Sequence, residues 1–172
     1  MCISDSYKHP QVVCFAHDSI SRKIMIDGLF EKKELFALKS FLLSEPYGRE
    51  TCLDIGGNIG HHALFFADLF DQVVSFEPNP KIFELLTINS NLAKNITAVN
   101  LGLCDQTDNL PVKVSNLNLG GTRYADPLNA NDSFSTMALD DYLLSAAPKS
   151  ISFIKMSAGG YELRAVSYTH LR

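Results

Sequence analysis

The sequence predicts an α/β domain built on a mostly parallel sheet with helices on both faces. From Thr51 onward, short apolar runs alternate with segments of helical spacing, which is typical of parallel strands joined by helices. The runs at 51–55, 72–77 and 151–156 are almost continuously apolar, as in strands buried on both faces. A length of 172 residues with 46% hydrophobic residues fits one globular domain with a sizeable core.

The segment before this alternation is predicted to form a short β-hairpin and then a helix. The runs VVCFA (12–16) and KIMI (23–26) are β-like and flank a turn at 18–21. The leucines within residues 29–44 recur at helical spacing, with charged residues on the opposite face. We therefore expect residues 1–50 to pack on the core of the α/β domain.

The remaining elements follow from the same patterns. Helices are expected over about 59–70 and over 81–95, and a strand is expected over 96–104. The polar stretch 116–133 reads as a loop over the edge of the sheet. Residues 135–147 are expected to be a strand end followed by a short helix.

Composition indicates a small-molecule partner. The net charge is −4 and no Lys/Arg-rich block occurs, which argues against a nucleic acid or an anionic membrane as the main partner. The four cysteines are scattered without a C-x-x-C pair, and no apolar stretch has the length of a signal peptide or a membrane span. We expect reduced thiols, no metal site and a cytoplasmic location; the oligomeric state is left open.

A glycine-rich turn, DIGGNIG, follows the strand 51–55 and opens the next helix. A turn of this kind can expose helix N–H groups to an anionic ligand. Gly56, Gly57 and Gly60 would let ligand atoms approach the backbone, although glycines at such turns also occur for packing alone.

Acidic residues follow the next two strands. Glu77 ends the strand 72–77, where a carboxylate can accept hydrogen bonds from both hydroxyls of a ribose; the alternative is a solvated carboxylate before a turn. Asp105 could meet an adenine edge or simply form a turn. The spacing G-G-N-I-G differs from the G-x-G-x-x-G of dinucleotide sites, so NAD is the second choice of nucleotide.

Five stretches together resemble successive motifs of one protein family: DIGGNIGHHALFFA, VVSFEPNP, NLGGTRY, TMALDDYL and FIKM followed by GGYEL. They are similar to the FkbM family of S-adenosylmethionine-dependent methyltransferases. The resemblance implies a Rossmann-like fold and, in most members, O-methylation of a hydroxyl on a sugar or natural product. It implies that Glu77 binds the cofactor ribose. It also implies that the methionyl end of the cofactor is held by the D-x-G-x-N-x-G segment, matched by Asp54, Gly56, Asn58 and Gly60.

One motif departs from the family pattern. Where the family usually has I-K-I-D-V-E-G, this chain has IKMSAGG, so Ser157, Ala158 and Gly159 replace the segment that carries two acids. Other side chains could act as a catalytic base, and each has an alternative role: His61 and His62 (packing or surface), Asp140 and Asp141 (helix caps) and Lys155 (snorkelling to solvent).

The resemblance also bears on domain organisation. We expect an incomplete methyltransferase domain over 51–166, with its last strands missing and the strand 151–156 left with an unpaired edge, and a non-native or disordered tail over 167–172. The leading functional hypothesis is methyl transfer from S-adenosylmethionine to a hydroxylated small molecule. The alternatives are an NAD-dependent oxidoreductase and a catalytically silent nucleoside-binding fragment.

Overall fold

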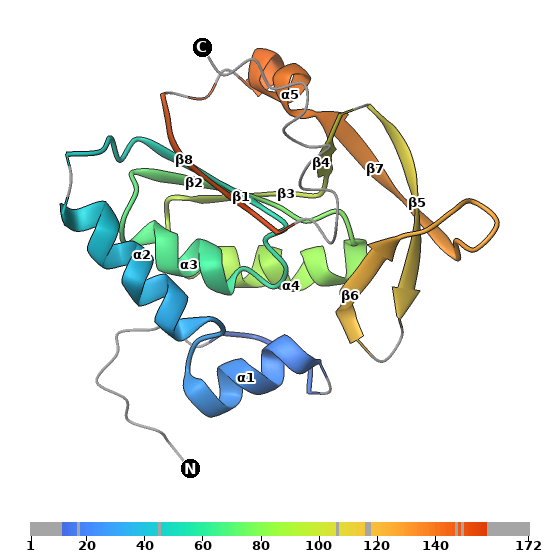
Figure 1. Cartoon of the computed structure of the whole chain (residues 1–172), viewed down its shortest axis with the longest axis horizontal. Coiled ribbons are helices and arrows are strands. Elements are labelled where there is room, and N and C mark those ends of the chain that lie inside the picture. The colour runs from blue at the N-terminus through green and yellow to red at the C-terminus, as the bar shows by residue number, and fades with distance from the viewer. Residues whose placement is uncertain are drawn as a thin grey trace.

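The central element of the fold is a parallel sheet. A computed structural model describes residues 12–16, 18–44, 46–105, 107–115, 118–146, 148 and 150–157. Its first sheet has four strands in the order β3-β2-β1-β8, and all neighbouring pairs are parallel (Figure 1). The strands are β1 (Thr51–Ile55), β2 (Gln72–Phe76), β3 (Ile96–Val99) and β8 (Ile151–Met156). The predicted α/β class with a mostly parallel sheet is confirmed.

Alternate side chains of each strand point to opposite faces of this sheet, and both faces pack against other elements. Cys52 and Val73 belong to a core that includes α2 (Lys32–Ser44) and α3 (His61–Ala67). Leu53 and Val74 belong to a second core that includes residues of α5 (Leu139–Ala146). Helices therefore lie on both faces, as the continuously apolar strands predicted.

Two helices have ends that the local sequence explains. Helix α4 (Pro80–Ser90) begins after Asn79, whose side chain accepts from the N–H of Lys81, and has proline in its first turn. Helix α1 (Ser19–Asp27) is capped by Asp18, which accepts from the N–H of Ser21, and ends at Gly28 with φ of 79°. No helix of the described residues is long and apolar enough to cross a membrane.

The predicted β-hairpin at the N-terminal side is wrong. Residues 23–26 lie in α1 and residues 12–15 form no strand. KIMI has a β-like composition, but it lies between two helix-end signals, the N-cap residue Asp18 and the C-terminal Gly28, and is therefore helical. The helix expected over 29–44 is confirmed as α2, which begins at Lys32.

A second sheet replaces the loop expected over 116–133. Its order is β4-β7-β5-β6, with β5 antiparallel to both neighbours and β4 parallel to β7. The strands are β4 (Gly102–Cys104), β5 (Asp108–Ser115), β6 (Asn118–Tyr124) and β7 (Asp132–Ala138). The single strand expected over 96–104 is divided, so that β3 pairs in the first sheet and β4 in the second. The sheet stands beside the first one (Figure 1).

The chain beyond Ser157 lies outside the described residues, including Ala158, Gly159 and the tail 167–172. Within the described residues β8 is an edge strand of the first sheet, paired only with β1. Its side chains are all half-buried.

Candidate functional site

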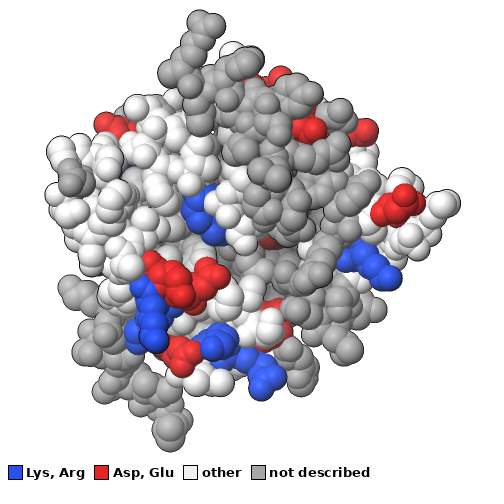
Figure 2. All heavy atoms as spheres, in the orientation of Figure 1, with Lys and Arg blue, Asp and Glu red and all other residues white. Residues whose placement is uncertain are grey.

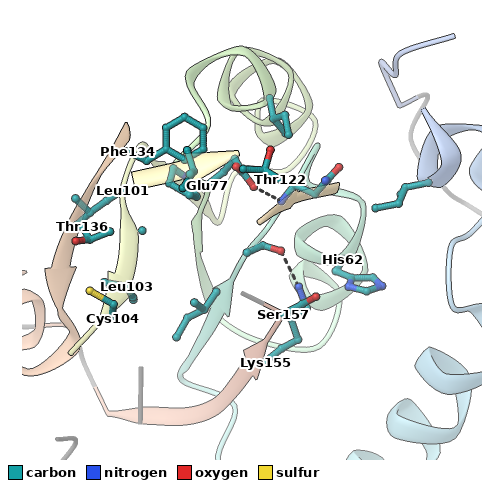
Figure 3. A pocket seen from close by; sticks show the side chains of 18 of the residues that line it. His62, Glu77, Leu101, Leu103, Cys104, Thr122, Phe134, Thr136, Lys155 and Ser157 are labelled. Carbon is teal, nitrogen blue, oxygen red and sulfur yellow. Dashed lines mark hydrogen bonds between the residues drawn. The ribbon is translucent and has the colours of Figure 1, made fainter. Parts of the chain in front are cut away.

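A cavity of about 200 Å³ opens at the carboxyl ends of β1, β2 and β8 (Figure 3). The second sheet forms one wall, and the loop between α1 and α2 contributes Phe30 and Glu31. Small-molecule sites usually measure roughly 300–1,000 Å³, so a ligand of nucleoside size would extend through the open mouth. Most of the wall is apolar, formed by Ile20, Ile55, Ile82, Leu101, Leu103, Leu110, Val112 and Phe134.

The glycine turn after β1 has three residues in the left-handed region. These are Gly56 (φ 75°), Asn58 (φ 52°) and Gly60 (φ 88°). Glycine adopts this conformation without penalty, and asparagine tolerates it. The N–H groups of Gly56 and Gly57 both donate to the Phe76 carbonyl, at 3.0 and 2.8 Å. These two amides therefore tie the turn to the end of β2.

Gly57 is required by packing rather than by a ligand. A Cβ at this position would lie 1.9 Å from Ser75 Oγ and 3.1 Å from Asp54 Oδ2. Gly57 is absent from the cavity wall. The packing alternative for this glycine is the one that the structure supports.

A row of three polar side chains crosses the sheet beneath the turn. Strand register places Asp54 opposite Ser75 on one side and Lys155 on the other. Ser75 Oγ donates to Asp54 Oδ2 at 2.9 Å, and Lys155 Nζ lies 2.8 Å from Asp54 Oδ1. Lys155 Nζ also donates to the Gly56 carbonyl at 2.9 Å. The ion pair compensates the buried charge of Asp54 and connects β8 to the glycine turn.

The burial of this row bears on the expected roles of Asp54 and Lys155. The Asp54 side chain is 0% exposed and lies outside the cavity wall, so it is not positioned to bind a cofactor ammonium group directly. Lys155 is 16% exposed on its side chain and lines the cavity, which favours the site over solvent.

Glu77 joins the two turns that follow β1 and β2. Its Oε2 accepts from the N–H of Asn58 at 3.0 Å, and its Oε1 accepts from the N–H of Asn79 at 2.9 Å. The side chain is buried in the cavity wall, and this burial raises its pKa to about 7 despite the two backbone donors. Each carboxylate oxygen retains a further lone pair, because a carboxylate offers about four acceptor sites.

Two adjacent histidines at the start of α3 also line the cavity. The rings of His61 and His62 are buried, with centroids 4.1 Å apart, and Phe30 packs edge-on against His61. Burial and nearby Lys155 lower the pKa of His62 to about 4, and burial holds the pKa of His61 well below its ordinary value. Both rings are therefore neutral at pH 7.

Six of the predicted site residues meet in one cavity: Gly56, Asn58, His61, His62, Glu77 and Lys155. The other predicted residues lie outside its wall: Asp54, Gly57, Gly60, Asp105 and Asp140. Asp140 is in the first turn of α5, where an acid is favoured by the helix dipole.

Sequence reasoning missed the wall residues of the second sheet and of the loop before α2, including Phe30, Glu31, Thr122, Phe134 and Thr136. The alternating pattern of β7 was the available signal for part of this wall. Phe134 and Thr136 are its buried positions and alternate with exposed residues.

Surface charge is mixed on the face drawn in Figure 2. Acidic and basic side chains of the described residues lie next to one another, without a broad block of one sign. In the described residues, no group of three or more His, Cys, Asp or Glu side chains is arranged to hold a metal ion.

The residues present fit a nucleoside. Glu77 offers a buried carboxylate with spare acceptor capacity, as a ribose diol requires, and its orientation is fixed by two backbone donors. Ile82, Leu101 and Leu103 form an apolar wall suited to a flat base.

Comparison with known proteins gives one curated relative. The chain is 27% identical over 126 residues to hexuronic acid methyltransferase AglP of Haloferax volcanii, a match that covers 73% of this chain and 52% of the relative. The chain thus spans about half the length of that relative. No family model matches the chain, and no solved structure matches it. The distant relationship supports a methyltransferase family, and a methyltransferase requires a methyl donor.

Proposed function

We propose that the chain carries the donor-binding part of an S-adenosylmethionine-dependent methyltransferase of the FkbM type. The observation that carries the proposal is the position of Glu77, whose carboxylate is held in the cavity wall by the turns after two neighbouring parallel strands. In this proposal Glu77 binds the ribose hydroxyls and the apolar wall holds the adenine. When bound, the donor would supply an electrophilic methyl group.

We propose a hydroxylated sugar as the methyl acceptor, with a hexuronic acid as the first compound to test. The support is the name of the distant relative, a hexuronic acid methyltransferase, together with the resemblance of the motifs to a family of O-methyltransferases. The acceptor would enter the same cavity, whose wall also includes Thr122 and Thr136 of the second sheet.

Calorimetric titration with S-adenosylmethionine and with NAD tests the proposal. S-adenosylmethionine should bind more tightly than NAD. Glu77→Gln should weaken its binding by about 1.5–3 kcal/mol, or roughly 10- to 150-fold in Kd, because hydrogen bonds to a charged group are lost. Glu84→Gln removes the same charge from an exposed position on α4 and should leave the affinity unchanged.

The affinity should also depend on pH. The pKa of Glu77 is raised to about 7, and the carboxylate form accepts hydroxyl donors better than the carboxylic acid. Binding should therefore weaken below pH 7 in the native chain, and less so in Glu77→Gln. Equal affinity of the native and Glu77→Gln chains, or tighter binding of NAD, would contradict the proposal.

A further inference from the structure

The histidine pair in the cavity wall has ring nitrogens with few partners within the protein. Among the described residues, neither nitrogen of His61 has a hydrogen-bond partner, although the side chain is buried. His62 Nε2 lies 3.5 Å from Glu31 Oε2, at the outer limit of a hydrogen bond. Buried polar atoms normally have partners, so unpartnered nitrogens at a cavity indicate a ligand group.

The electrostatic surroundings keep these rings neutral. Burial and Lys155 from β8 oppose protonation of His62, while Asp54 from β1 and a hydrogen bond to the backbone of Phe30 favour it. His61 beside it and Glu31 from the loop before α2 are the other ionisable groups facing the ring. A neutral imidazole has one nitrogen with a free lone pair and can accept a proton.

Glu31, whose side chain lies 3.5 Å from His62, has an unusual backbone conformation. Its φ is 55°, the left-handed region that a residue with a Cβ seldom adopts, and its carbonyl accepts from the N–H of Leu35 in the first turn of α2. Such conformations persist where the surrounding structure enforces them, often at functional sites. The carboxylate is half-exposed and sits at the cavity with Phe30.

Two other groups of the cavity wall, Lys155 and Ser157, are poorly suited to accept a proton. The Lys155 ammonium is bonded to Asp54 and to the Gly56 carbonyl, and an ammonium has no lone pair. Ser157 stands in the cavity wall where the family pattern has an acid. A carboxylate beside an imidazole, as in Glu31 and His62, is a recurring arrangement for orienting a base.

We propose that His62 takes the proton from the acceptor hydroxyl during methyl transfer and that Glu31 is the positioning residue that orients its ring. This role rests on the proposed function. The acceptor oxygen forms a bond to the methyl carbon of the sulfonium donor as the carbon–sulfur bond breaks, and the electron pair remains on sulfur. The hydroxyl proton passes to a ring nitrogen of His62 and from there to water.

The first test measures turnover with S-adenosylmethionine and either glucuronic acid or glucose as acceptor. His62→Gln should lower kcat by about 100-fold or more, the usual contribution of a general base, with Kd for S-adenosylmethionine within twofold. Glu31→Gln should lower kcat by about tenfold, since it acts through another residue. Glu34→Gln removes a charge from an exposed position of α2 and is the matched control.

The second test does not depend on turnover. The His62 ring is followed by NMR as the pH is lowered, in the native chain, Glu31→Gln and Glu34→Gln. A carboxylate that faces the ring favours its protonated form, so Glu31→Gln should lower the pKa of His62 and Glu34→Gln should not. Glu31 is half-exposed, so its variant is expected to fold.

The outcomes separate the two proposals. Absence of S-adenosylmethionine binding overturns the proposed function, and this inference with it. Three results overturn the inference but not the proposed function. The first is donor binding without transfer to either sugar, and the second is full kcat in His62→Gln. The third is a glucuronate product that is only the methyl ester, since a carboxylate acceptor needs no base. An unchanged His62 pKa in Glu31→Gln removes the positioning role.

Discussion

Replacing Lys155 by methionine should strongly destabilise the chain. The Asp54 carboxylate is fully buried, and Lys155 Nζ at 2.8 Å is the cation paired with it. Removing one partner of a buried ion pair typically costs about 3–5 kcal/mol, because it leaves an uncompensated buried charge. Since domains of this size are stable by only about 5–15 kcal/mol, Lys155→Met should remove a large share of the total.

A second substitution should recover much of this loss. In Asp54→Asn/Lys155→Met both charges are gone, and the asparagine oxygen can still accept from Ser75 Oγ. Replacing a whole buried pair by neutral groups is often nearly neutral, so the double variant should lie within about 1–2 kcal/mol of the native chain. Adding Asp54→Asn to Lys155→Met should therefore recover about 1–4 kcal/mol of the lost free energy of unfolding.

Urea unfolding followed by far-UV circular dichroism measures these free energies, and the chain contains no tryptophan for fluorescence. Lys23→Met is the control, because Lys23 pairs with Asp27 at 3.9 Å on exposed α1 and should contribute at most about 0.5 kcal/mol. The reasoning is refuted if Lys155→Met costs no more than Lys23→Met, or if adding Asp54→Asn gives no recovery.

Two further predictions concern packing and pH. Gly57→Ala should lower the free energy of unfolding by about 2–3 kcal/mol, because the new Cβ would meet Ser75 Oγ. When Ser75 is already alanine, the same change should cost less than about 1 kcal/mol. Equal costs in urea titrations of the two backgrounds would exclude this contact. The pKa of His62 falls from 6.5 to about 4 on folding. Its contribution to the free energy of unfolding should be fully present above pH 6.5 and be lost as the pH falls toward 4, by about 3 kcal/mol in total. His62→Gln should flatten the unfolding free energy over this range, and a slope equal to that of the native chain would refute the assignment.

The first sheet was predictable from sequence because its strands are both apolar and bounded by glycine or charged residues. Strand β1 was expected at 51–55 and found there. The N-terminal hairpin failed because the period of a four-residue run such as KIMI cannot separate strand from helix, whereas the caps Asp18 and Gly28 could. The second sheet was missed because turn-forming residues dominate the composition of 116–133 and hide the alternation around them.

For the site, sequence spacing located Glu77 at the correct strand end, and the structure places it in the cavity wall. Asp54 was assigned to a ligand because the sequence does not reveal strand register. Only the register of β8 against β1 brings Lys155 opposite Asp54 and so gives the carboxylate a partner within the protein. The wall residue Glu31 precedes α2 and is distant in sequence from every motif, so no local signal marked it.

The separation of the cavity walls between two sheets has a consequence for evolution and design. The buried row and the Glu77 turns belong to the first sheet, whereas Thr122 and Thr136 face the cavity from the second. Under the proposed function, exchanging Thr122 and Thr136 would alter which acceptors are admitted, while Glu77 keeps its two backbone donors. A library that varies these two positions would therefore test new acceptors without altering the hydrogen bonds of Glu77.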